Sequence, residues 1–346
     1  MQAFRSFVRF LSALLLALLL HVPADAAEID PALVAAAKRE GRLVLYTPMI
    51  VDQIVRPLAA AFRAKYGIEV QYLRMDSAAV VLKILNEHRA RRVEADVFST
   101  SLGIESLIAS GAARKIESAS AAELPPNYRD PQGYWAANRL YVLGPAFNTT
   151  MIKPEDAPKT FEDLLDPKWA GKIVWRRNNL TGATGFVANV LVTMGDEKGM
   201  DYLRRLARQR LITVSISDRA VLDQIIAGEY AITIAMTNHN VEISRKQGAP
   251  VAWNPLDTAM IYSEQMGLTT LSARPNAGKL FLEYALSREG QTVFQKAGYI
   301  PTHPAVAPLE PKLLPAGGGF KGNVFTPDFV AQHRKRWDDI VIQLFR

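Results

Sequence analysis

The segment NNLTGATGFVANVLV, residues 178–192, decides how the fold is read, because it joins a predicted strand, Lys172–Trp175, to a predicted helix. The turn Thr181–Gly185 (TGATG) supplies two glycines that let the backbone approach a ligand and two threonine hydroxyls. If the helix begins at Phe186, the first amides of the turn lack partners and favour an anion. The alternative is a strand-to-helix turn that binds nothing.

Composition places the chain among folded globular proteins. It has 346 residues, 49% hydrophobic and 22% charged, which is enough for two domains. There is no cysteine, which excludes disulfides, thiol chemistry and zinc–cysteine sites. The formal charge of +7 suits an anionic ligand. The basic residues are scattered, so no nucleic-acid partner is predicted.

Residues 1–26 are predicted to be a secretory signal peptide. Arg5 and Arg9 form a basic start, Leu11–Leu20 is an apolar stretch too short to span a bilayer well, and Ala24–Ala26 fits a small-x-small cleavage site. We therefore expect export to the periplasm. An uncleaved anchor is the alternative, while the missing cysteine excludes a lipoprotein anchor.

The mature chain begins with alternating strands and helices, which predicts a parallel sheet flanked by helices. Ligands bind at the carboxyl ends of such strands. Here those ends carry hydroxyl side chains, Thr47 and Ser99–Ser101. The predicted strands are Leu43–Tyr46, Ile68–Leu73 and Ala95–Phe98. The predicted helices are Asp30–Glu40, a helix from Val51 up to Gly67, a helix capped by Asp76 or Ser77 that carries Val80, Val81, Ile84 and Leu85, and Gly103–Ser110.

A second α/β pattern follows a long predicted crossing strand, Tyr134–Asn148, and Thr258–Leu268 is extended enough to carry the chain back. The predicted fold class is therefore α/β with two lobes, each a mostly parallel sheet flanked by helices, joined by a hinge with a cleft between them. The first lobe is expected to hold residues 27–140 and 262–346, and the inserted second lobe residues 141–261. Three further helices are predicted at Pro275–Leu286, Arg288–Ala297 and Asp328–Leu344.

At this point the residues resemble a known family. The chain is similar to the periplasmic solute-binding proteins of ABC importers, in the branch that contains the ferric-ion binders. The resemblance implies a type II periplasmic-binding-protein fold, a monomer that is not an enzyme, and a membrane permease as partner. The segments that carry it are GRLVLYT (41–47), KYGIEV (65–70), EADVFST (94–100), FEDLLDPKWAGKI (161–173), TGATGF (181–186), IIAGEYAITI (225–234) and the tail from Ala273 to Pro304 with PNAGKLFLEYALSREGQ and GYIPTHP.

The chain departs from the ferric binders where they hold their metal. The resemblance implies two adjacent tyrosines after the strand that matches Tyr230–Ala235, and this chain has Asn238-His239 there. The histidine that often follows the first strand is also missing, since Thr47–Ile50 reads TPMI. Ferric iron needs hard phenolate oxygens, so no metal or cofactor is predicted. The turn Thr181–Thr184, which holds a synergistic anion in the ferric binders, remains to hold the anionic end of the ligand itself.

Two further side chains are candidates for the ligand. His239 either donates a hydrogen bond to a carboxylate or phosphonate oxygen or makes a local loop contact. Arg139, in the crossing strand, either clamps a carboxylate or forms an interlobe ion pair. Tyr141 and Trp175 either wall the pocket or pack in the core, with the core as the default.

Two classes of function follow. The first is a binding protein that captures a small anion (a carboxylate, phosphonate or phosphate ester) for an importer, and a chemosensory binding protein would have the same sequence features. A ferric binder with non-tyrosine ligation and a synergistic anion is its variant. The second is a secreted hydrolase using His239 with Glu264 or Asp257, for which no activated nucleophile is visible. No catalytic or metal-binding residue is predicted, and the predicted ligand residues are Thr47, Ser99, Ser101, Arg139, Thr181, Gly182, Ala183, Thr184, Ser217, Asn238 and His239.

Overall fold

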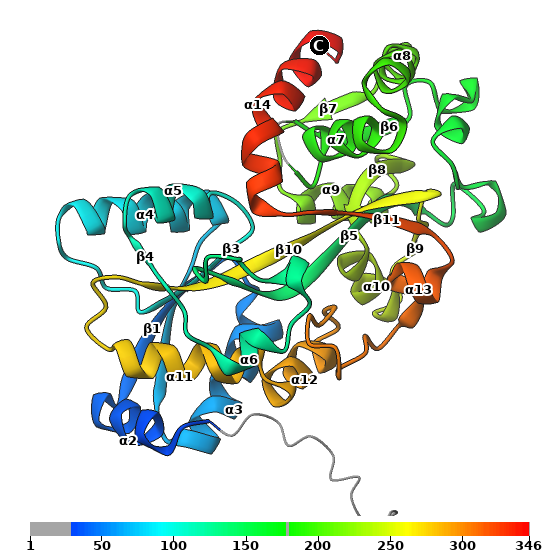
Figure 1. Cartoon of the computed structure of the whole chain (residues 1–346). Helices are drawn as coiled ribbons and strands as arrows, with labels where there is room; N and C mark the ends of the chain where they lie inside the picture. Colours follow the sequence, from blue (N-terminus) through cyan, green and yellow to red (C-terminus); the bar gives the residue numbers. More distant parts are fainter. Residues whose placement is uncertain (1–28, 178–179, 346) are drawn as a thin grey trace, which may run out of the picture.

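Two long antiparallel strands, β5 (Ala136–Asn148) and β10 (Thr258–Thr269), run side by side through the middle of the molecule and join its two halves (Figure 1). Every residue of both strands is buried. The computed structural model describes residues 29–177 and 180–345, so the predicted signal peptide and Asn178-Asn179 lie outside the described residues. Across the described part of the chain, no helix has the length and apolar character to cross a membrane.

The first lobe, as we name the half around strands β1 to β3, is built on parallel strands. β1 lies between β2 and β3 and pairs in parallel with both, and β3 joins β10 in antiparallel fashion. Phe62 and Phe281 pack edge to face in its core. The elements are α2 (Pro31–Glu40), β1 (Arg42–Thr47), α3 (Arg56–Tyr66), β2 (Glu69–Arg74), α4 (Ser77–Arg89), β3 (Val97–Thr100), α5 (Ile104–Ala109), β4 (Ala113–Arg114), α6 (Ala119–Ala122), α11 (Pro275–Leu286) and α12 (Arg288–Lys296).

Local sequence explains where several of these helices begin and end. Asp30 and Asp76 cap α2 and α4 by accepting hydrogen bonds from backbone amides two and three residues on. Gly67 ends α3 with φ of 74°, a left-handed conformation that glycine adopts without strain. A π-helical turn, Val51–Val55, precedes α3.

The second lobe, as we name the half around strands β6 to β8, repeats the arrangement. β8 pairs with β5, and β6 lies in parallel between β8 and β7. The β5–β8 register shifts between Gly144 and Ala146, at Pro145, which has no backbone N–H to donate. The elements are β6 (Ile173–Arg176), α7 (Ala183–Met194), α8 (Asp196–Ala207), β7 (Ile212–Val214), α9 (Asp218–Ala227), β8 (Ile232–Thr237), α10 (Asn238–Lys246) and β9 (Val251–Trp253).

The C-terminal segment returns to the second lobe. After α13 (Pro315–Gly318), β11 (Lys321–Phe325) pairs in parallel with the start of β10, and α14 (Pro327–Leu344) packs on α7 (Figure 1). The Phe345 ring lies 4.6 Å from that of Trp175 in the core of this lobe. The expected division assigned residues 262–346 to the first lobe. The structure instead packs residues 321–345 against the second lobe. The apolar helix α7 has buried residues along most of its length, and α14 shields part of it from solvent. The other boundaries stay a prediction.

Candidate ligand-binding cleft

A cleft of ≈ 840 Å³ lies between the two lobes, at the carboxyl ends of their parallel strands. Arg74 and Ser101 line it from the first lobe, and Ser217 and His239 from the second. Arg139, on the crossing strand β5, lines the bottom of the cleft. This is the place where parallel sheets bind ligands.

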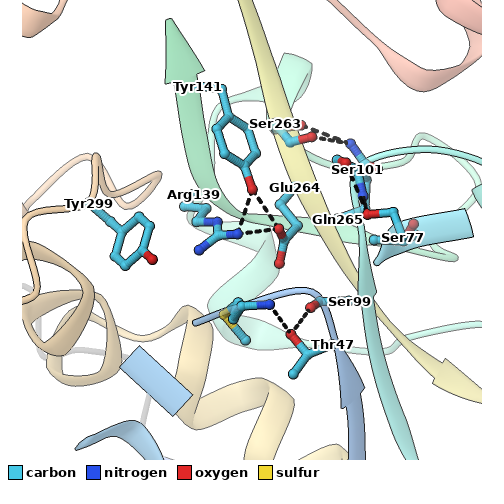
Figure 2. Close-up of polar contacts among 12 residues, drawn as sticks. Thr47, Ser77, Ser99, Ser101, Arg139, Tyr141, Ser263, Glu264, Gln265 and Tyr299 are labelled. Carbon is cyan, nitrogen blue, oxygen red and sulfur yellow. Dashed lines mark hydrogen bonds and ion pairs between the residues drawn. The ribbon is translucent and has the colours of Figure 1, made fainter. Parts of the chain in front are cut away.

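Arg139 is the most buried cation of the cleft, with only 4% of its surface exposed. Its Nη2 donates hydrogen bonds of 2.5 Å to Tyr141 Oη and 2.5 Å to Glu264 Oε2 (Figure 2). Its Nε and Nη1 have no hydrogen-bond partner among the described residues. The predicted alternative of an ion pair is therefore present, but Glu264 lies on the neighbouring crossing strand and occupies one nitrogen only.

Aromatic rings surround this guanidinium. The ring centre of Tyr299 lies 4.5 Å from the Arg139 guanidinium carbon, and Tyr141 stacks on Tyr262 with ring centres 4.6 Å apart. Burial raises the pKa of Tyr141 and Tyr262 well above the ordinary value, so both are neutral phenols. Tyr141 Oη donates to Glu264 Oε2 at 2.6 Å. Tyr141 thus lines the cleft, whereas Trp175 is fully buried in the core.

His239 lies in the first turn of α10, between the rings of Tyr141 and Tyr299 at 5.4 and 5.0 Å. Burial, and secondarily the charge of Arg139, lower the pKa of His239 to about 3. The ring is therefore neutral at pH 7 and offers hydrogen bonds rather than charge. Its Nδ1 has no partner within the described part of the chain, and no hydrogen bond there joins His239 to Glu264 or Asp257.

Arg176 is a second cation held in place by the second lobe. Its Nε donates to the Ile216 carbonyl at 2.6 Å, and its Nη1 donates to Asp218 Oδ1 at 2.8 Å and to Thr181 Oγ1 at 3.2 Å. Burial raises the pKa of Asp218. Thr181, Arg176 and Asp218 all line the cleft.

The rest of the predicted anion turn does not face the cleft. Thr184 is fully buried, and its Oγ1 donates to Asp338 Oδ1 on α14 at 2.5 Å. A Cβ at Gly182 would come within 2.5 Å of the Arg176 carbonyl oxygen, and one at Gly185 within 1.9 Å of the Leu180 carbonyl oxygen. The glycines therefore allow the chain to approach itself, and the interpretation that they admit a ligand is wrong. Ala183 is also fully buried and does not line the cleft.

The hydroxyl residues of the first lobe divide in a similar way. Thr47 and Ser99 are fully buried, bonded to each other at 2.6 Å, and do not line the cleft (Figure 2). Ser101 lines it and lies 3.1 Å from Ser77, oxygen to oxygen. The strand-end rule thus selected two hydroxyl groups that are buried and hydrogen-bonded to each other, and not two that line the cleft.

Among the described residues, three helices begin at the cleft and place their partially positive ends there, namely α4, α9 and α10. Ser217 lines the cleft as the N-cap of α9 and accepts a hydrogen bond from the Ala220 amide at 3.1 Å. Asn238 begins α10 but is fully buried, and its Nδ2 donates to the Leu313 carbonyl at 2.8 Å. Asn238 therefore does not reach the cleft.

Arginines outnumber acidic side chains along the cleft, although Arg139, Arg176 and Arg219 are each paired with a carboxylate. Among its described lining residues, four arginines face two aspartates. Within residues 29–177 and 180–345, no cluster of three or more histidine or acidic side chains is placed to hold a metal. Sequence reasoning missed several lining residues. The strand-end rule that was applied to β1 and β3 would have found Arg74 at the end of β2, and Tyr299 lies in the GYIPTHP segment. The missed lining residues include Arg74, Ser77, Asp218, Arg219, Tyr262 and Tyr299.

Comparison with known proteins gives consistent matches. The family profile described as bacterial extracellular solute-binding protein matches residues 93–317. An uncharacterized protein of Haemophilus influenzae is 24% identical over 275 residues, which are 76% of this chain and 78% of that protein. Iron uptake protein A1 of Synechocystis is 23% identical over 218 residues, 59% of each chain.

Solved structures share the fold of type II periplasmic binding proteins. Iron-bound HitA from Pseudomonas aeruginosa superposes with a TM-score of 0.72 at 21% identity, covering 86% of this chain and 99% of HitA. AfuA from Actinobacillus pleuropneumoniae, with exogenous fructose-6-phosphate bound, gives 0.71 at 23% identity, covering 88% and 99%.

Proposed function

This chain belongs to the bacterial extracellular solute-binding proteins, in their ferric-binding-protein-like branch, and on that premise we propose that its cleft captures a small organic anion for the membrane permease of an ABC importer. Proteins of this family are transport components rather than enzymes. The anion would sit between the lobes, which would close on it by bending at β5 and β10.

The observation that carries this proposal is Arg139 with two unused nitrogens in a buried position. A buried donor without a partner costs about 1–3 kcal/mol, so a ligand oxygen that accepts from Nε and Nη1 gains that amount in addition to its charge interaction. A carboxylate, phosphonate or phosphate presents two oxygens in the spacing that a guanidinium fork matches. Glu264 behind Arg139 cancels part of its charge and fixes the direction of the fork.

Three features support an anion over a neutral solute. The helices α4, α9 and α10 all begin at the cleft, arginine outnumbers aspartate on its walls, and Arg74 is exposed there without an ion pair among the described residues. AfuA, which shares the fold, was solved with a phosphorylated sugar bound. We therefore place phosphate esters first among the three anion classes.

Iron is the second candidate, because HitA was solved with iron and two relatives in Synechocystis are named iron uptake proteins. The cleft does contain Tyr141, Tyr262 and Tyr299. Their burial raises the pKa of each phenol, with that of Tyr141 and Tyr262 well above the ordinary value, which opposes the phenolate form that ferric iron requires.

Calorimetric titration of the purified, ligand-stripped protein tests this proposal. We expect fructose-6-phosphate, inorganic phosphate or a carboxylate such as citrate to bind more tightly than glucose. Thr181→Ala should weaken binding of the best anion by up to about tenfold, because Thr181 Oγ1 accepts from Arg176 Nη1 and helps to hold this cation at the cleft, and one net hydrogen bond contributes about 1 kcal/mol.

Thr184→Ala is the matched control, because Thr184 faces Asp338 and not the cleft. A neutral or cationic best ligand would overturn the proposal. Stoichiometric ferric iron giving a strong visible charge-transfer band would favour the iron alternative instead.

A further inference from the structure

A second cavity, of ≈ 120 Å³, adjoins the cleft. The two share lining residues, among them Ser101, Leu180 and Tyr262. The far wall of the cavity is α14, through Val330 and Ala331. A water molecule occupies about 30 Å³ in the liquid, so this space is large enough for a small functional group. The anion site at Arg139 makes no use of it.

Gln265, on β10, gives the second cavity its chemical character. The side chain lines the cavity and is only 2% exposed. Its Nε2 donates to the Ser263 carbonyl at 2.7 Å and to Ser263 Oγ at 3.2 Å, which fixes the orientation of the amide (Figure 2). The amide oxygen Oε1 is buried and has no partner among the described residues. An acceptor that is both buried and unpaired calls for a hydrogen-bond donor.

The remaining walls indicate what kind of donor fits. Leu102, Leu180 and Phe325 are apolar and suit an aliphatic carbon chain. Glu105 and Arg334 also line the cavity. Arg334 is paired with Asp338 at 3.4 Å, and burial raises the pKa of Glu105, which favours its neutral form. Neither a cation nor an anion is therefore favoured by the local charge, which leaves a hydroxyl as the matching donor.

We propose that this cavity is a second subsite, in which Gln265 Oε1 accepts a hydrogen bond from a hydroxyl of the same ligand whose anionic group is held at Arg139. This rests on the function proposed above and deepens it. The ligand class is then an aliphatic organic anion that carries a hydroxyl group several bonds away from its phosphate or carboxylate.

The test uses two series of probes of defined chain length, n-alkyl phosphates and the corresponding ω-hydroxyalkyl phosphates, titrated calorimetrically into the full mature protein. At one chain length the hydroxyl should improve affinity by about tenfold over the unsubstituted probe, as one net hydrogen bond provides. This comparison within the wild-type protein needs no variant.

Gln265→Met keeps the volume of the side chain and removes the acceptor. It should abolish the preference for the hydroxylated probe and leave the affinity for the n-alkyl phosphate unchanged. Gln71→Met, on β2 and outside both cavities, is the matched control and should behave like the wild type.

The outcomes separate this inference from the proposed function. If alkyl phosphates bind but the hydroxyl gives no advantage at any length, or if Gln265→Met retains the advantage, the subsite is wrong while the anion site stands. Tighter binding of ω-aminoalkyl phosphates than of their hydroxyl analogues would overturn the choice of an uncharged donor. If no phosphate probe binds at all, the proposed anion function itself fails.

Discussion

Arg139 and Glu264 form a buried pair in which the arginine keeps two nitrogens unused and the glutamate keeps one oxygen, Oε1, unpaired. Such pairs contribute little net stability, since desolvation offsets their attraction. Breaking one, however, leaves an uncompensated charge. The pair is therefore better understood as a means of presenting the guanidinium fork to the cleft in a single orientation.

A prediction follows for Arg139→Met. The variant should lower the free energy of unfolding by about 3–5 kcal/mol, because Glu264 remains buried without its ion-pair partner. The double variant Arg139→Met with Glu264→Gln should recover most of that stability but not anion binding. Urea unfolding and calorimetry on both variants measure the two effects. Equal loss of stability in the single and double variants would contradict this reading.

His239 predicts a dependence of stability on pH. Because burial depresses its pKa to about 3 in the folded protein, against about 6.5 when unfolded, the unfolded state binds more protons between these values. Above about pH 6.5 the free energy of unfolding does not depend on the protonation of His239. Below that value it decreases steadily as the pH falls toward 3. The slope reaches about 1.4 kcal/mol per pH unit.

Urea unfolding of the wild type and of His239→Gln at pH 7.5, 6.0 and 5.0 measures this. The variant should show a shallower loss of stability on acidification. His333→Gln, on α14 outside the cleft, serves as the control variant. Parallel pH profiles for the wild type and His239→Gln would rule out His239 as the source.

Among single residues, the sequence identified those whose position follows from the chain alone. Arg139, Ser217 and His239 were found because they stand at a crossing strand or at a strand-to-helix junction, and all three line the cleft. Thr184 was misplaced because its partner, Asp338, is 154 residues away in the sequence. No local pattern reveals that such a hydroxyl is already engaged.

At the scale of elements, α14 supplies part of the core of the second lobe. Trp337 is 2% exposed and packs against Phe325 and Phe329, with ring centres 5.9 and 5.7 Å away. Ile342 lies on the same helix but is 53% exposed. The helix is therefore anchored by one face only, as its amphipathic pattern requires.

Trp337→Ala should lower the free energy of unfolding by about 3–5 kcal/mol, the usual cost of truncating a large buried side chain. Ile342→Ala, the matched control, should change it by less than about 0.5 kcal/mol. Chemical denaturation monitored by circular dichroism distinguishes the two. Similar values for both variants would mean that α14 does not contribute to this core.

Most elements of the fold were predictable because their hydrophobic periodicity is strong. The exceptions are short or polar. β11 has four of its five residues at least partly exposed and exists only through its pairing with β10. Thr160–Leu165 has a helix-like sequence, but only a 3-10 turn, Glu162–Leu165, forms there. α14 packs on the second lobe because the surface of α7 is exposed there until α14 covers it. That surface exists only in the assembled fold, so the local sequence of α14 does not indicate it.

At the scale of the whole molecule, both crossing strands lie next to each other in the sheet, so the lobes are expected to bend about a common axis. We predict that saturating the protein with its anion reduces the radius of gyration in small-angle X-ray scattering. Arg139→Met with Glu264→Gln, which should not bind the anion, is the control. An unchanged radius in the wild type at saturating ligand would exclude closure of the cleft.

The path of the chain has a consequence for how the protein is made. The core of the first lobe needs Phe281 and Phe294, and that of the second needs Trp337 and Phe345, so both cores wait for segments that the ribosome synthesises late. A nascent chain of this kind cannot complete either lobe before translation is nearly finished. We therefore expect both lobes to fold only after most of the chain has been made, which would leave the chain unfolded long enough for export.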